Sequence, residues 1–150
     1  QNHDVQSNGL SALATLARNK LAREYIWEGG GIPLLFNAIK SYPSNQNVQR
    51  YGCLAIAYFS EGKEELLGRL GAVDHVLTAM NDHADNKIVQ ENGYNALGAL
   101  LKNNHENRKR FCTKGGVVVV LKAASNRVLQ FFARNDETDA LLGLRSERGT

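Results

Sequence analysis

The sequence repeats itself at an interval of a little over forty residues. The pair Val-Gln occurs at 5–6, 48–49 and 89–90, so the copies lie 43 and 41 residues apart. Three residues after each glutamine stands a glycine, and small or apolar residues follow six, seven, eight and ten residues after it. A period of this length is typical of arrays of small structural units, none of which can bury its apolar face alone.

A second block recurs with the same period. Ile32, Val73 and Val117 each follow a glycine-containing step, and further apolar residues come three and four positions later. This i, i+3, i+4, i+7 pattern predicts amphipathic helices. In the first complete unit it predicts a short helix over 21–28 that ends at glycine, a second helix over 32–41 and a long third helix over 48–60.

Two further features of the repeat concern helix ends and helix packing. Asn47 and the pair Asp85-Asn86 precede the long helices and are expected to cap their free N–H groups. The glycine three residues after each glutamine has poor helix propensity, and the residue eight after it is small in every copy. We expect them to be there because neighbouring helices approach closely at both positions.

Composition narrows the classes of protein. The chain has 150 residues, of which 43% are hydrophobic and 22% charged, so it can form a packed core. Two cysteines are too few for a disulfide scaffold and favour an intracellular, cytoplasmic location. No apolar run approaches the roughly 20 residues of a membrane-spanning helix. A net charge of +3 is too small for the strongly basic face of a nucleic-acid-binding protein, so no nucleic-acid partner is expected.

With the steps "EGGGIPLL" and "TKGGVVVVL", and Val-Gln at the start of each long helix, residues 4 to about 125 resemble armadillo repeats. The resemblance implies an all-α fold, a right-handed α-solenoid of three-helix repeats. Residues 1–125 would hold about three repeats, starting at a third helix. Residues 126–150 would form a divergent or truncated C-terminal repeat or cap, and the chain would be a fragment of a longer one.

The resemblance also implies a function. In the family, the third helices line a concave groove that binds proteins or peptides without catalysis. Peptide-binding members of the importin-α type carry Trp and Asn one turn apart on these helices. At the matching positions this chain has Ser11 and Thr15, Leu54 and Tyr58, and Asn95 and Ala99. A strongly basic groove of the β-catenin type is also missing, because Arg50 is the only basic residue in the groove columns. We therefore expect neither of these two modes of recognition in this chain.

The candidate binding residues lie one, two, five and nine positions after each glutamine. Positions one, five and nine share one helical face. They differ between the copies, whereas the apolar columns agree. The candidates are Asn8, Ser11, Thr15, Arg50, Tyr51, Leu54, Tyr58, Glu91, Asn92 and Asn95. Arg50, Leu54 and Tyr58 form the best patch, since Arg and Tyr are frequent at interface hot spots. The alternative is an ordinary solvated face on which Tyr58 shelters against the neighbouring long helix.

No residue pattern predicts a catalytic site, a metal site or a cofactor. No two of the four histidines are spaced as an i, i+4 metal pair, and the glycine steps lack the Lys-Ser/Thr of a P-loop. Cys53 falls in a core column, which favours packing over nucleophilic chemistry. The basic run 108–110 is expected to be a solvated face, or else a contact for an acidic partner or a membrane surface.

We therefore expect a non-catalytic scaffold that binds a protein or peptide, possibly another domain of its own chain. The alternative is a regulatory domain of a larger enzyme, which would sense a ligand or hold a catalytic domain inactive. A nucleic-acid-binding array ranks third and a stand-alone enzyme last. If the last repeat is cut, its bare apolar ends would favour end-to-end association.

Overall fold

The chain is all-helical throughout the residues that the computed structural model describes, which are 3–134, with side chains described for 4–125. This confirms the all-α prediction. Within that range no strand is present. The helices are α1 (His3–Leu16), α2 (Lys20–Glu28), α3 (Gly31–Ser41), α4 (Gln46–Phe59), α5 (Glu64–Arg69), α6 (Ala72–Asp82), α7 (Lys87–Leu101), α8 (His105–Thr113) and α9 (Gly116–Arg134).

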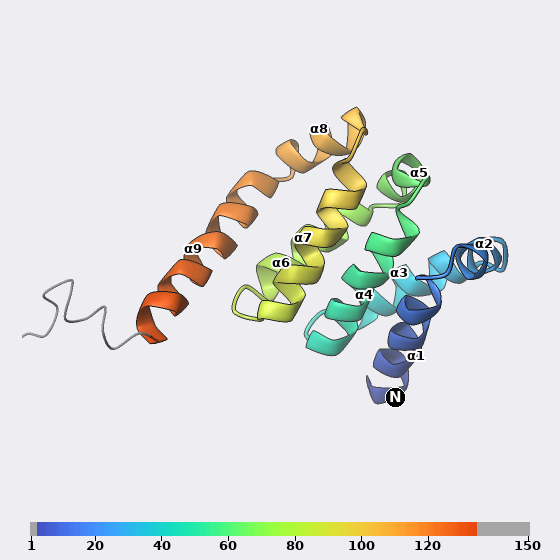
Figure 1. The fold of residues 1–150 in the computed structure, drawn as a ribbon, viewed down its shortest axis with the longest axis horizontal. Helices are drawn as coiled ribbons and strands as arrows, with labels where there is room; N and C mark the ends of the chain where they lie inside the picture. Colours follow the sequence, from blue (N-terminus) through green and yellow to red (C-terminus); the bar gives the residue numbers. More distant parts are fainter. Residues whose placement is uncertain (1–2, 135–150) are drawn as a thin grey trace, which may run out of the picture.

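The helices follow the period of the sequence. Helices α2–α3–α4 and α5–α6–α7 form two units of three, with α1 before them and α8–α9 after them. The long helices α1, α4 and α7 lie side by side, because α4 packs along both of the others (Figure 1). The three Val-Gln segments thus occupy equivalent places in a row of helices. We call α1, α4 and α7 the third helices, and α3, α6 and α9 the second helices.

Glycines separate the first helix of each unit from the second. Gly30, Gly71 and Gly115 have φ angles of 75°, 89° and 74°. This left-handed conformation is strained for residues with a side chain, so glycine is required at the step. The expected role of the glycine steps as helix punctuation is confirmed.

Asparagine side chains cap the third helices α4 and α7. The Asn45 carboxamide oxygen accepts hydrogen bonds from the backbone N–H groups of Asn47 (3.0 Å) and Val48 (3.1 Å). Asn86 caps α7 in the same way, as predicted. The prediction that Asn47 caps α4 is wrong, because Asn47 already lies in the first helical turn. Asn45 has the extended backbone that a cap requires, with φ −86° and ψ 106°.

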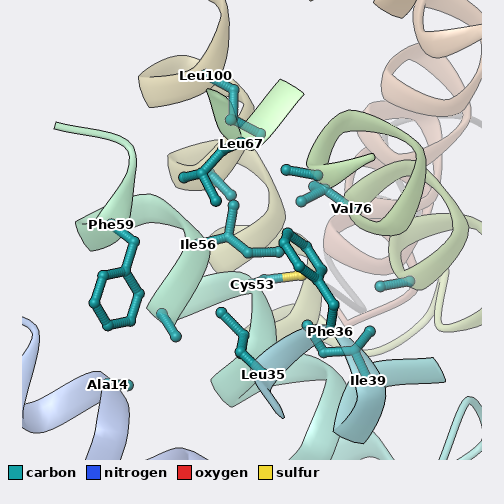
Figure 2. Close-up of a cluster of buried hydrophobic side chains, with 14 of the residues drawn as sticks. Ala14, Leu35, Phe36, Ile39, Cys53, Ile56, Phe59, Leu67, Val76 and Leu100 are labelled. Carbon is teal, nitrogen blue, oxygen red and sulfur yellow. The ribbon is translucent and has the colours of Figure 1, made fainter. Parts of the chain in front are cut away.

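The core lies between the second and third helices and continues from one unit into the next. Phe36, Ile39, Cys53, Ile56 and Val76 meet in it (Figure 2). Burial raises the pKa of the Cys53 thiol to about 12, which keeps it protonated. The expected packing role of Cys53 is confirmed.

The glycine after each Val-Gln is explained by helix contact in the two complete units. A Cβ atom on Gly52 would lie 2.6 Å from Ile39 Cγ1, and one on Gly93 would lie 2.5 Å from Met80 Cγ. The prediction for the small residue at position eight is wrong at Gly98, which is exposed and would meet nothing within 4 Å. Its face of α7 is not covered by another described helix.

Buried glutamines tie α4 and α7 to the turns that precede them. Gln49 Nε2 donates to the carbonyl oxygens of Ile39 (2.9 Å) and Tyr42 (3.0 Å). Gln90 Nε2 repeats the pair, donating to Met80 (2.7 Å) and His83 (2.9 Å). These carbonyls end the second helix and have no partner within it, which explains why the motif needs a long amide side chain.

Consecutive units are also linked at the turns between second and third helices. His83 Nε2 lies 2.7 Å from the carbonyl oxygen of Pro43, and Asn86 Nδ2 donates to Gln46 Oε1 at 2.8 Å. Each bond joins residues 40 positions apart, close to one period. Stacking of units is therefore fixed by polar contacts as well as by the core.

Helix α9 differs from the other second helices. It has 19 residues, whereas α3 and α6 have 11 each, and it runs without a turn through the position where those two end. The segment in which we expected a further third helix, about 137–144, lies outside the described residues. None of the helices between residues 3 and 134 is both long enough and apolar enough to span a membrane.

Candidate functional site

All ten candidate residues lie on α1, α4 and α7, and Leu54 packs partly against the apolar core. Tyr51 and Tyr58 also contact the core with part of their rings. We call these ten residues the third-helix face. Asn8, Thr15, Glu91 and Asn95 are exposed, and the others are half-buried: Ser11, Arg50, Tyr51, Leu54, Tyr58 and Asn92.

Arg50 and Tyr51 form the centre of this face. The Arg50 guanidinium carbon lies 4.4 Å from the centroid of the Tyr51 ring, and Arg50 Nη2 donates to the Tyr51 hydroxyl at 2.6 Å. This is a cation–π contact joined to a hydrogen bond. A guanidinium held in this way has little rotational freedom left.

The neighbouring third helices hold this pair from both sides. Ser11 of α1 hydrogen-bonds to the Tyr51 phenol, and Asn92 Nδ2 of α7 donates to the Arg50 carbonyl oxygen at 2.9 Å. The Ser11 bond is the main cause of a lowered Tyr51 pKa, opposed by burial and aided by the hydrogen bond and charge of Arg50. Ser11, Tyr51, Arg50 and Asn92 therefore form a cross-helix chain through α1, α4 and α7.

The cross-helix chain of Ser11, Tyr51, Arg50 and Asn92 gives part of the candidate site a structural role that the sequence did not indicate. Asn92 and Arg50 are 42 residues apart, and only the stacking of the helices brings them together. The repeat register was the available signal, because it placed both residues on neighbouring third helices. It did not show that their polar groups would bond to each other.

Two of the remaining candidates contact residues of their own helix. Thr15 Oγ1 donates to the Ser11 carbonyl oxygen at 2.8 Å, and Glu91 lies 3.8 Å from Lys87 Nζ in an exposed pair. Leu54 and Tyr58 continue the central patch along α4, one turn apart. Together with Arg50 they present a charged, an aliphatic and an aromatic side chain in a line, so the structure does bring the best predicted patch together.

One atom of this patch has no internal partner. Arg50 Nε is buried and makes no hydrogen bond with any described residue. A buried donor without an acceptor is uncommon and costs about 1–3 kcal/mol.

No family model, no curated protein and no solved structure matches this chain.

The basic run 108–110 is divided between two roles. Arg108 Nη1 donates to the Leu101 carbonyl oxygen at 3.0 Å, and Arg110 donates to the Gly68 carbonyl oxygen. Lys109 points into a cavity of about 430 Å³ between α5 and α8, whose walls also carry Glu65 and Glu106. Four cationic side chains line it in all, but Arg69 is paired with Glu65 and Lys114 with Asp74.

His75 and His83 make contacts that stabilise the packing of the helices. The His75 ring stacks on Phe36 with centroids 5.1 Å apart, and burial, with the nearby charge of Lys40, lowers the pKa of His75. His83 bonds to the turn of the preceding unit. Among the described side chains no group of three or more His, Cys, Asp and Glu residues is arranged to hold a metal ion.

Proposed function

We propose that the chain is an armadillo-type right-handed α-solenoid and that it acts as a non-catalytic protein-interaction scaffold. Its partner, a protein or an extended peptide, binds along the third-helix face, which forms the inner wall of the solenoid. The repeat of about 42 residues, the three-helix units and the parallel third helices support this proposal. A partner along this wall would run across α1, α4 and α7.

The observation that carries the proposal is the fixed position of Arg50. Its guanidinium carbon lies 4.4 Å from the centroid of the Tyr51 ring, and the Tyr51 phenol is hydrogen-bonded to Ser11 of α1. Asn92 of α7 donates to the backbone carbonyl oxygen of Arg50. A side chain that is ordered before binding loses little conformational entropy when a partner arrives.

The chemistry of the patch indicates what the partner presents. Arg50 is half-buried and offers hydrogen-bond donors and a positive charge, so a carboxylate or a backbone carbonyl is a suitable acceptor. Leu54 and Tyr58 offer an aliphatic and an aromatic contact in the next turns of α4. We expect a partner segment with an acceptor group followed by an apolar side chain.

The test is a peptide selection from a random library displayed on phage, with the whole chain as bait. Peptides selected by the wild type should bind the Arg50→Ala and Tyr58→Ala variants at least about tenfold more weakly, because each truncation removes a central contact. Leu66→Ala, an exposed position on α5, is the matched control and should bind as the wild type does. Peptides that bind the Arg50→Ala and Tyr58→Ala variants as tightly as they bind the wild type would contradict the proposal.

A further inference from the structure

The positive charge of the chain is concentrated on α8 and the residues next to it. The segment 102–114 contains five basic side chains and one acidic one: Lys102, Arg108, Lys109, Arg110, Lys114 and Glu106. Its formal net charge of +4 exceeds the +3 of the whole chain, so the rest of the chain carries a net charge of −1. A concentration of one charge on a single element attracts ligands of the opposite charge.

The cavity of about 430 Å³ between α5 and α8 lies on this basic segment. Helices α5 and α8 lie side by side at the C-terminal ends of α4 and α7 (Figure 1). The volume is within the range of ligand pockets, roughly 300–1,000 Å³. Four basic and two acidic side chains line the cavity, so its wall has a net charge of +2: Arg69, Lys109, Arg110, Lys114, Glu65 and Glu106.

Arg110 is the basic side chain of this wall whose position is fixed. It is half-buried, and its Nη1 donates to the backbone carbonyl oxygen of Gly68 in α5. Its Nε and Nη2 make no hydrogen bond with a described residue, and neither atom is fully buried. A guanidinium that is anchored through one nitrogen therefore keeps N–H donors for the oxygens of an anion.

The other basic side chains of the wall are also available. Lys109 is exposed and has no ion pair or hydrogen bond with another described residue. The side chains in the Arg69–Glu65 pair are 74% and 64% exposed, and those in the Lys114–Asp74 pair are 58% and 36% exposed. Exposed ion pairs contribute little to stability, so Arg69 and Lys114 can turn towards a bound anion at small cost.

We propose that the cavity between α5 and α8 binds a phosphate monoester group, with Arg110 and Lys109 as its main contacts. Such a group carries a charge of about −1.5 to −2 at pH 7, which balances the net charge of +2 on the wall. A single carboxylate would leave half of that charge uncompensated. None of the lining residues belongs to the third-helix face, so this is a second site on the molecule.

A membrane surface fits this part of the chain less well. A helix that lies in a membrane interface needs an exposed apolar face. Within α8, which is described over its whole length, the one large apolar side chain is Phe111, and it packs against the core. Glu65 and Glu106 in the cavity wall also repel an extended anionic surface, whereas a single compact anion can avoid them by binding at Arg110 and Lys109.

The test is a titration of the full 150-residue chain with inorganic phosphate and with free phosphoserine, followed through the amide signals in ¹H–¹⁵N NMR spectra. Saturable shifts should appear in residues 64–69 and 105–114. Lys109→Ala should weaken binding at least about fivefold, because it removes a charged donor from the phosphate. Glu106→Gln should strengthen binding about twofold or more, because it removes a negative charge from the cavity wall.

Lys102→Ala is the matched control, since it removes the same charge from an exposed position of the same segment but does not line the cavity. It should bind phosphoserine as the wild type does, and circular dichroism should show unchanged helicity for every variant. A wild type without saturable shifts in these residues would overturn the proposal. Equal weakening by Lys109→Ala and Lys102→Ala would also overturn it, because it would indicate a general effect of charge.

A further arm identifies the source of the phosphate group. A short peptide of alanine and glycine with a central phosphoserine is compared with its unphosphorylated form and with free phosphoserine. Tighter binding of the phosphopeptide than of free phosphoserine would assign the site to a phosphorylated protein segment, and equal binding would assign it to a small phosphate ester. An unphosphorylated peptide that binds as tightly as the phosphopeptide would contradict the proposal. Arg50→Ala should leave all these affinities unchanged, so this proposal and the one for the third-helix face can fail separately.

Discussion

At the scale of single residues, equal residue types in one repeat have unequal surroundings. Gly93 and Gly98 both lie in α7, yet a Cβ atom on Gly93 would lie 2.5 Å from Met80 Cγ and one on Gly98 would meet nothing within 4 Å. Glycine in a helix costs up to about 1 kcal/mol relative to alanine. The surroundings decide whether alanine recovers this energy.

We therefore expect Gly98→Ala to raise the free energy of unfolding by about 0.5–1 kcal/mol. Gly93→Ala should lower it by about 1 kcal/mol, because overpacking against buried Met80 exceeds the gain in helix propensity. Urea denaturation followed by circular dichroism measures both variants. A Gly93→Ala variant as stable as Gly98→Ala would show that Met80 yields without cost.

His75 gives a prediction for pH dependence. Burial and the charge of Lys40 lower its pKa in the folded chain, whereas in the unfolded chain histidine titrates near its usual value of about 6.5. As the pH falls through that value, the unfolded state takes up a proton that the folded state still excludes. Stability contributed by neutral His75 is full above about pH 6.5 and decreases below it, until the folded pKa is reached.

Replacing His75 with Phe keeps an aromatic ring against Phe36 and removes the titration. The difference in unfolding free energy between wild type and variant should therefore shift in favour of the variant as the pH is lowered from 8 to 5. Denaturant titrations at several pH values measure this difference. A difference that is independent of pH would assign the acid sensitivity to other groups.

At the scale of elements, α4 and α7 begin where an asparagine caps them and not where the apolar pattern begins. Asn45→Ala removes the acceptor for two backbone N–H groups and should cost about 1 kcal/mol of stability. Asn47→Ala, two residues later and exposed, should change the stability by less than about 0.5 kcal/mol. Thermal unfolding of both variants tests this, and equal losses would contradict the assignment of the cap.

At the scale of the whole described array, the units are joined by buried polar contacts as well as by apolar packing. Asn107 of α8 is 3% exposed, and its Nδ2 donates to the carbonyl oxygens of Glu64 and Leu100, both at 2.8 Å. Glu64 lies 43 residues earlier, in the preceding unit. This one amide therefore anchors α8 to the unit before it.

Asn107→Ala should lower the free energy of unfolding by about 2 kcal/mol, since two carbonyl oxygens lose the amide that donates to them. In an array whose units contact only their neighbours, the loss should be local at first. Amide hydrogen exchange measured by mass spectrometry should therefore quicken in α8 and α9 before it does so in α3 and α4. Equal acceleration in all helices would show that the array unfolds as a single unit.

Most of the fold could be predicted from the sequence because its signals are local. The recurrence of Val-Gln and of the glycine steps fixes where helices alternate, and the apolar columns identify the faces that are buried in the complete units. These features depend on backbone conformation and on helical periodicity, which neighbouring residues determine. The helix over 32–41, expected from such signals, differs by one residue from α3.

The tertiary structure determines whether equivalent residues of the repeat are buried or exposed. Val5, Val48 and Val89 share one column, yet the first is 60% exposed and the others 0%, because only α4 and α7 have a second helix of their own unit packed against them. In the sequence, Arg50 and Asn92 look like independent surface residues. Stacking of the helices places them so that the Asn92 amide donates to the Arg50 carbonyl oxygen. Periodicity determines which face of a helix is apolar, but only the neighbours that stack against that face determine whether it is covered.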